Sequence, residues 1–354
     1  SLTYLSWGCL SLLPNLYPHV FLLASLPMTL SGGSCAVYLL TYCYISDVTN
    51  EQTRSFRMAV LITAIFTSNV LGTILAPLLM YTQHSLNPYP FIFFLSASIP
   101  LVSALYTHWY IQESVYVKLV RDEVLLSLTH VKSLFSACFR HRKGNARPMI
   151  LLIIAAQTLR VFMAEGELAI LYLSVREMFS WQLPEYSAYY CFYNVMLGVG
   201  AMSGVWVFST KLGMSNSLVI ALVFFTRCIR CVMMAIADSG DYLYFGAVVS
   251  MFVSVSDPLC HTEMSRMVQQ HEVGKVFALT SIVESFTPIG SAPLYTFVYE
   301  MTFMQAPGAV FLMSAAISAI AALMIAIVYI MQRFVNEECY QTGYLEELHE
   351  QTTI

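Results

Sequence analysis

Three ionisable side chains interrupt one long apolar segment, residues 149–173, and are the first candidates for chemistry. They are Arg160, Glu165 and Glu167. A charge inside a bilayer is costly unless it is paired or hydrated, so such residues mark functional sites or buried ion pairs. Glu167 follows Arg160 by seven residues, which places both on one helix face about two turns apart. Two readings stay open: Glu167 binds a proton, or it pairs with an arginine and holds helices together.

Two further apolar segments also carry charges. Arg227 and Arg230 lie in one, and Glu284 lies in another, just before Pro288 and Pro293. In a cavity the two arginines would suit an organic anion, because a guanidinium binds a carboxylate through two parallel hydrogen bonds; the alternative is structural pairing. Glu284 either lines a cavity beside a helix broken at the prolines, or it pairs with Arg227 or Arg230.

A third set of candidates has helical spacing. Asp257 and His261 are four residues apart and share a helix face. Because histidine titrates near neutral pH, they read as a proton relay or as a pair at the cytoplasmic end of a helix. Tyr38 and Tyr42 have the same spacing; they could stack on an aromatic ligand or pack within the bundle.

The polar segment 46–57 is expected to be a cytoplasmic loop with Asp47, Arg54 and Arg57. Salt bridges among these residues could latch a gate. Alternatively, the charges only set the topology.

The elements that position these residues must cross a membrane. The chain has 354 residues, of which 58% are hydrophobic and 11% charged, against about 25% charged in soluble domains. The composition predicts an all-α polytopic membrane protein. Nucleic acid binding is not expected, because the basic residues lie in short loops. No metal site or cofactor is expected either, since the CxxC at 228–231 lies within a span and has no second pair.

Apolar runs of about twenty residues, the length needed to cross a bilayer, give the order of the spans. We expect a partial helix over 2–13 and then complete spans over 19–45, 58–81, 91–111, 149–173, 188–208, 218–237, 242–260, 276–298 and 310–330. The segments 46–57, 176–186 and 261–275 read as polar loops or turns.

Basic residues predict which side these loops face. Seven of the 17 Lys and Arg residues lie in 112–148. If the spans alternate in direction, thirteen of the 17 basic residues lie on the same side of the membrane as segment 112–148. Only Arg176 lies on the opposite side, and three lie within spans. Positively charged loops stay in the cytoplasm. We therefore expect a partial N-terminal bundle (1–112), a basic cytoplasmic loop (113–148), a C-terminal six-helix bundle (149–332) and a cytoplasmic acidic tail (333–354).

Six spans follow the long loop, and four, counting the partial one, precede it. This describes a 6+6 helix bundle of the major facilitator type. We expect helices 1, 2 and part of helix 3 to precede Ser1 in the natural protein.

Several motifs, at consistent spacing over most of the chain, resemble one family. Residues 46–58 read SDVTNEQTRSFRM and 265–278 read SRMVQQHEVGKVFA; 167–172 read ELAILY and 112–114 read QES. They are similar to the loop after the fourth helix, the loop between the tenth and eleventh, the acidic stretch of the seventh and the end of the sixth in solute carrier family 46. This is the proton-coupled folate transporter family.

The resemblance implies that helices 1, 4, 7 and 10 line a cavity, but the chain departs from the family pattern at functional positions. Ile62, Phe162 and His261 stand where the family has Glu, His and Arg, and Ser25 replaces a helix 4 arginine. Proton dependence must then use other groups. Glu167 is our first choice, because it keeps the acidic position of helix 7.

The sequence thus predicts a secondary active transporter, a proton-linked symporter of an organic anion or folate-like solute that works by alternating access in the plasma or endolysosomal membrane. Its partners would be the bilayer, the solute and protons. The alternatives are a transporter-like receptor or scaffold without flux, and a membrane-embedded enzyme, for which no HExxH or GxSxG motif is found. Uptake measured against binding separates transporter from receptor.

The loop-charge asymmetry makes a direct prediction about topology. Single cysteines introduced by Lys132→Cys and Glu346→Cys should both stay unlabelled when intact cells are treated with a membrane-impermeant maleimide, and both should react after permeabilisation. Labelling of either site from outside would refute the assignment.

Overall fold

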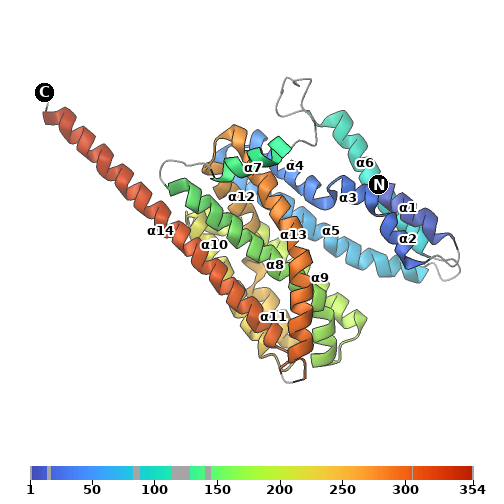
Figure 1. The fold of residues 1–354 in the computed structure, drawn as a ribbon. Helices are drawn as coiled ribbons and strands as arrows, with labels where there is room; N and C mark the ends of the chain where they lie inside the picture. The colour runs from blue at the N-terminus through green and yellow to red at the C-terminus, as the bar shows by residue number, and fades with distance from the viewer. Residues whose placement is uncertain are drawn as a thin grey trace. The chain divides into compact units, whose positions relative to one another are not determined.

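Helices make up nearly all of the described chain (Figure 1). The computed structural model describes residues 2–13, 17–82, 88–112, 128–139, 145–304 and 306–352, and these ranges contain no strand. The chain forms two compact units, Ser1–Val48 with Thr67–Asp122, and Thr49–Phe66 with Glu123–Ile354. Residues 49–66, which the sequence assigns to the N-terminal bundle, therefore pack with the C-terminal helices. The all-α fold class is confirmed.

The first unit is built from helices of unequal length. They are α1 (Leu2–Ser11), α2 (Pro18–Leu23), α3 (Leu26–Leu30), α4 (Gly33–Val48), the C-terminal half of α5 (Glu51–Thr82) and α6 (Pro88–Tyr110). The prediction of one continuous span over 19–45 is wrong. Gly32 and Gly33 have φ values of 78° and 53°, left-handed conformations that glycine adopts readily and that interrupt a right-handed helix.

The second unit holds most of the long helices. They are α7 (Leu128–Phe139), α8 (Ala146–Phe179), α9 (Leu183–Gly204), the π-helix η2 (Val205–Lys211), α10 (Asn216–Ala235), α11 (Asp241–Val249), the 3₁₀-helix η3 (Met251–Val255), α12 (Ser256–Arg266), α13 (Gln270–Thr302) and α14 (Ala309–Thr352). Two regions expected to be irregular are partly helical. α7 lies within the predicted basic loop, and α14 continues through the predicted tail as far as Thr352.

The polar loops predicted at 46–57, 176–186 and 261–275 are much shorter than expected. Only residues 49–50 separate α4 from α5, residues 180–182 separate α8 from α9, and residues 267–269 separate α12 from α13. A helix satisfies its backbone hydrogen bonds locally, so it continues past the hydrocarbon boundary with polar side chains. Hydropathy therefore marks the embedded part of each helix and not its ends.

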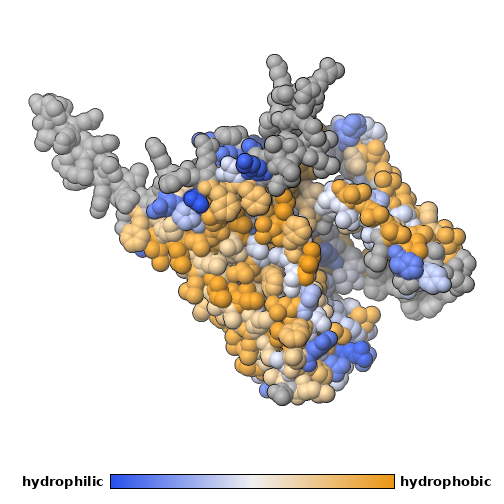
Figure 2. All heavy atoms as spheres, viewed as in Figure 1, coloured by the Kyte–Doolittle hydropathy of each residue, from blue (hydrophilic) through white to orange (hydrophobic). Residues whose placement is uncertain are grey.

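Within the described ranges, seven helical segments are long and apolar enough to cross a membrane by length and composition. They are Thr53–Leu75, Tyr89–Tyr110, Ala146–Phe179, Leu183–Phe208, Asn216–Ala235, Asp241–Arg266 and Ala309–Phe334. On the face of the second unit seen in Figure 2, apolar residues cover much of the coloured surface, and hydrophilic residues gather towards its ends. Large apolar side chains of α13 and α14 are exposed; Phe286 and Leu323 are both 65% exposed. Such a surface suits lipid and not water.

Within the second unit, α10 packs along α14, α13 packs along α8, and α9 packs against η3. The α9–η3 contact depends on one small residue. A Cβ atom at Gly200 would lie 1.8 Å from the carbonyl oxygen of Met251, so only glycine permits this backbone approach. η3 belongs to the Asp241–Arg266 span, which is built from three helical pieces, α11, η3 and α12.

This packing predicts that Gly200→Ala destabilises the protein by about 3 kcal/mol, the upper end of the usual cost of overpacking, because the added methyl meets backbone that cannot move aside locally. Gly72→Ala is the matched control. Gly72 also lies within a helix, α5, but no atom lies within 4 Å of its added Cβ. Thermal unfolding of the purified protein in detergent should show a large loss for Gly200→Ala and none for Gly72→Ala. Equal melting temperatures would contradict the packing described.

Candidate functional site

The first polar cluster, called the Arg160 cluster, joins α8, α12 and α13 and consists of Gln157, Arg160, Asp257 and Glu284. Arg160 Nη2 lies 2.7 Å from Asp257 Oδ1. Gln157 Nε2 donates to the same oxygen, and Arg160 Nε donates to Gln157 Oε1 at 3.1 Å. The side chains of Arg160 and Asp257 are 21% and 16% exposed, so the pair is neither sealed nor fully hydrated.

Glu284 reaches this cluster from α13. It is half-buried, and its carboxylate interacts with Arg160, Asp257 and Gln157. Among the described residues, its Oε1 has no hydrogen-bond partner. The predicted break at Pro288 and Pro293 is wrong, because α13 runs continuously from Gln270 to Thr302 with both prolines inside. The arginine that interacts electrostatically with Glu284 is Arg160, whereas Arg227 and Arg230 pair with Glu167.

His261 lies one turn after Asp257 on α12. It is 3% exposed, and its ring meets the ring of Phe277 of α13 edge to face at 4.8 Å between centroids. The expected helix end at this pair is wrong, because α12 continues to Arg266. Asp257 turns its carboxylate to Arg160 of α8. A proton-relay role for His261 stays a prediction.

The second cluster is centred on Glu167, which lies between two arginines of α10. Arg230 Nη1 is 3.1 Å from Glu167 Oε2, and Arg227 Nη2 is 3.6 Å from Oε1. Exposure of the three side chains is 3%, 6% and 8% for Arg230, Arg227 and Glu167. Tyr193 lies under the Arg230 guanidinium at 5.0 Å.

This geometry favours the structural reading of Glu167 and of both arginines. Glu167 and Arg160 lie on one helix, as the spacing predicts, but their carboxylate and guanidinium have different partners on different helices. The buried carboxylate is held by a charge-assisted hydrogen bond from Arg230 and by the ion pair with Arg227. It is therefore less accessible to protons and solute than the Arg160 cluster.

The third cluster, called the α5–α12 contact, consists of Arg54, Ser55, Thr262 and Ser265. Arg54 Nη1 donates to Ser265 Oγ at 2.7 Å, and Ser55 Oγ lies 3.3 Å from Thr262 Oγ1. The expectation that Asp47, Arg54 and Arg57 lie in a loop is wrong. Asp47 is in the last turn of α4, and Arg54 and Arg57 are in the first turns of α5.

The remaining candidates lie apart from these clusters. Arg57 is exposed on α5; on α4, Tyr38 is exposed and Tyr42 is buried. Glu165 is half-buried on α8 and makes no hydrogen bond or ion pair within the described part of the chain. Phe162 packs against Tyr295 of α13 at 6.2 Å between ring centroids, and Ile62 is buried on α5.

Sequence reasoning missed several polar partners. Gln157 binds both members of the Arg160–Asp257 pair, and the buried Glu263 of α12 bonds to Asn216 and Gln332. A signal for Gln157 was present, since it is a polar residue within an apolar run and lies one helical turn before Arg160. Glu263 lies in the segment 261–275, which the sequence predicts to be a polar loop. A carboxylate in such a loop is expected to be hydrated, so its sequence context offers no reason to look for partners.

The Glu167 cluster predicts an asymmetric pair of results. Glu167→Gln leaves two buried guanidiniums without a carboxylate, which costs about 3–5 kcal/mol, so little folded protein should reach the membrane. Arg227→Gln should cost much less, because the closer Arg230–Glu167 pair remains. Surface abundance and thermal stability measure both effects, with Glu165→Gln as the control on the same helix. Normal stability of Glu167→Gln would refute the structural role.

Comparison with known proteins places this architecture in a family. The chain matches the family model of the Major Facilitator Superfamily over residues 1–289. It is 24% identical over 321 residues to a probable peptidoglycan muropeptide transporter of solute carrier family 46 from Drosophila melanogaster, covering 88% of this chain and 61% of that protein. It is 22% identical over 325 residues to the proton-coupled folate transporter of Rattus norvegicus, with 88% and 66% covered.

A third relative, the lysosomal proton-coupled steroid conjugate and bile acid symporter of Mus musculus, is 19% identical over 332 residues, with 90% of this chain and 69% of that protein covered. The chain thus spans 61% and 66% of the first two relatives' lengths. All three relatives are transporters by name and not enzymes.

Solved structures agree on the fold. The human organic anion transporter MFSD10 has a TM-score of 0.71 at 14% identity, covering 91% of this chain and 74% of that one. The fucose:proton symporter of E. coli has a TM-score of 0.65 at 16% identity, with 92% and 82% covered. The chain therefore belongs to the Major Facilitator Superfamily, and its relatives described here are members of solute carrier family 46, as its motifs predicted.

Proposed function

We propose that the protein is a secondary active transporter that moves a small organic anion together with protons by alternating access. The observation that carries this proposal is the Arg160 cluster. One guanidinium and two carboxylates meet there from α8, α12 and α13, and the ion pair is partly exposed. An intramembrane charge cluster that is open enough to exchange partners is the usual mark of a transport site.

Charge balance links the anion to the proton. Asp257 occupies Arg160, and an anionic solute needs the same guanidinium for its own carboxylate. If the solute entered while Asp257 and Glu284 were both ionised, three negative groups would surround one cation in a medium of low dielectric constant. Such repulsion is strongly unfavourable. A proton on either carboxylate relieves it, so solute entry and proton uptake favour each other.

Glu284 replaces Glu167 as the first candidate for the proton. Asp257 accepts hydrogen bonds from Arg160 and Gln157, whereas one oxygen of Glu284 lacks a partner among the described residues. Glu284 interacts electrostatically with Arg160 of α8 and with Asp257 of α12. The thiol of Cys260, also on α12, interacts with the same three side chains. His261 is the residue after Cys260 on α12, and its side chain is buried.

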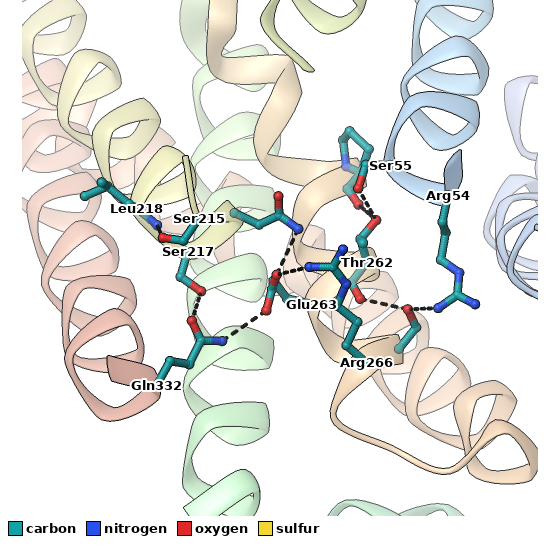
Figure 3. A network of polar contacts seen from close by, with 12 residues as sticks. Arg54, Ser55, Ser215, Ser217, Leu218, Thr262, Glu263, Arg266 and Gln332 are labelled. Atoms are coloured by element: carbon teal, nitrogen blue, oxygen red, sulfur yellow. Dashed lines mark hydrogen bonds and ion pairs between the residues drawn. The ribbon is translucent and has the colours of Figure 1, made fainter. Parts of the chain in front are cut away.

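The α5–α12 contact is proposed as one gate of the cycle. One bond across it is donated by Arg54 Nη1 to the Ser265 hydroxyl at 2.7 Å (Figure 3). A hydrogen bond from a charged group to a neutral partner contributes only about 1.5–3 kcal/mol, which the free energy of solute binding and proton entry can offset. In the proposed cycle, this bond breaks when the gate opens.

The printed names of the relatives support this class of function. One is a proton-coupled folate transporter and another a proton-coupled symporter of steroid conjugates and bile acids. Because Ile62, Phe162 and His261 replace polar family residues, we propose an organic anion and do not choose folate. The seven apolar helical segments make the protein integral to a membrane; we propose the plasma or endolysosomal membrane, with residues 113–148 and the C-terminus in the cytoplasm.

Uptake by the full-length protein tests the proposal, with labelled folate, a bile acid and a muropeptide as probes at several pH values. At least one probe should enter faster at acid pH. Glu284→Gln, which removes the titratable group but keeps its shape, should reduce the acid stimulation by about 5- to 100-fold, the range of typical coupling free energies. Asp257→Asn should also reduce it, because Arg160 loses its counter-ion.

Glu300→Gln, an exposed position on the same helix α13, is the matched control and should behave as the wild type. Saturable binding of a probe without uptake would favour the receptor alternative. An unchanged pH profile in both Glu284→Gln and Asp257→Asn would refute the Arg160 cluster as the coupling site.

A further inference from the structure

The short helix α7 carries a stripe of exposed side chains that lies outside the proposed transport site. Lys132, Phe135, Ser136 and Phe139 are exposed, and their spacing of i, i+3, i+4 and i+7 places them on one helix face. The rings of Phe135 and Phe139 are 49% and 47% exposed and stack at 6.4 Å between centroids. Cys138, about 100° around the helix from Phe139, is buried. We call the four exposed residues the α7 stripe.

Two long helices hold α7 in place, because it packs against α13 and also contacts α8. Arg147, in the first turn of α8, joins the stripe directly. Its guanidinium carbon lies 5.9 Å from the centroid of the Phe139 ring, within the range of a cation–π contact. The guanidinium and the two rings therefore form one continuous surface.

The length of α8 gives the depth of this surface. The apolar run 149–173 is centred on residue 161, and Arg147 precedes that centre by about 14 residues, or about 21 Å along the axis. Half of the hydrocarbon core of a bilayer is about 15 Å thick, and half of a bilayer with its headgroups is about 20–22 Å thick. Arg147 and the adjoining Phe139 ring thus lie at the level of the lipid headgroups.

The charge at this level is positive. Residues 124–164 contain six Lys and Arg residues and no Asp or Glu. Lys132 and Arg147 are both exposed. In the first turns of α13, against which α7 packs, Glu272 is buried and Lys275 is exposed. The surface therefore offers cations and aromatic rings to a partner that is both anionic and apolar.

We propose that the α7 stripe and Arg147 form a binding surface for anionic phospholipids. Phe135 and Phe139 insert between the acyl chains, and Lys132 and Arg147 contact the headgroups. An amphipathic helix with apolar rings and adjoining cations lies in a membrane interface in this way. A soluble anion supplies the charge but no acyl chains for the rings.

The inference goes beyond the proposed transport function and does not depend on it. In the proposed topology the surface faces the cytoplasmic leaflet, which is the leaflet that contains anionic lipids. The same surface on the other side of the membrane would meet few such lipids. The lipid preference is therefore expected to be useful only in the orientation that the basic residues predict.

Quenching of tryptophan fluorescence by brominated lipids tests the proposal on the full-length protein in phosphatidylcholine nanodiscs. Phe135→Trp places a fluorophore on the α7 stripe, and its emission is read as the difference from the wild type, which has four Trp. Brominated acyl chains should quench it, because the ring lies at the interface. Brominated phosphatidylserine should quench more strongly than brominated phosphatidylcholine, because each Lys or Arg near an anionic surface increases the affinity about fivefold.

Lys132→Gln combined with Arg147→Gln, in the Phe135→Trp protein, removes both charges and keeps long polar side chains. The preference for phosphatidylserine should fall by about 25-fold, the product of two fivefold effects, and added salt should also lower it. Both residues are exposed, so the melting temperature should not change. Lys211→Gln, which removes an exposed charge on η2, is the matched control and should leave the preference unaltered.

Three outcomes would overturn the proposal. If neither lipid quenches the fluorophore, the stripe does not reach acyl chains. If both lipids quench equally, the stripe is an apolar anchor without headgroup recognition. If an equal amount of soluble glycerophosphoserine displaces brominated phosphatidylserine, the surface is a site for free anions. No solute uptake enters the measurement, so its failure is distinct from a failure of the transport proposal.

Discussion

The cost of an unpaired charge in a low-dielectric interior determines how the second unit is assembled. Arg160, Arg227 and Arg230 all lie in apolar helices, and each is matched to a carboxylate from a different helix. α8 contributes one charged residue at each of two levels. Arg160 pairs with α12, and Glu167 pairs with α10. The two levels are about 10 Å apart along the helix axis. Removing one partner strands the other, so these pairs fix the rotation of α8, α10 and α12 together.

The exposed fraction of the paired side chains differs between the Glu167 cluster and the Arg160 cluster, and this difference makes them different kinds of site. The side chains of the Glu167 cluster are at most 8% exposed, whereas Arg160 and Asp257 are 21% and 16% exposed. A sealed pair cannot exchange partners without a large desolvation cost, and a partly hydrated pair can. The same pairing chemistry therefore holds the bundle in one place and allows exchange with a solute in the other.

The sequence predicted the helical class and the family, because hydropathy and local motifs are properties of contiguous residues. It failed where the answer depends on tertiary placement. The spacing of Arg160 and Glu167 correctly puts both on α8, but their partners lie 97 and 63 residues away, and the rotation of α10 and α12 decides which carboxylate meets which arginine. Gly32 and Gly33 lie within the run predicted as one span, and their positive φ values show the break.

α12 is the element on which the proposed function depends most. Within eleven residues it carries Asp257 for the Arg160 cluster, Thr262 and Ser265 for α5, and Glu263 for α10 and α14. Asp257 and Ser265 are only about 12 Å apart along the axis. In the proposed cycle, a solute that displaces Asp257 from Arg160 acts on the same short rigid helix that contacts α5. Coupling between the site and the gate then needs no extended pathway, because both are attached to one helix.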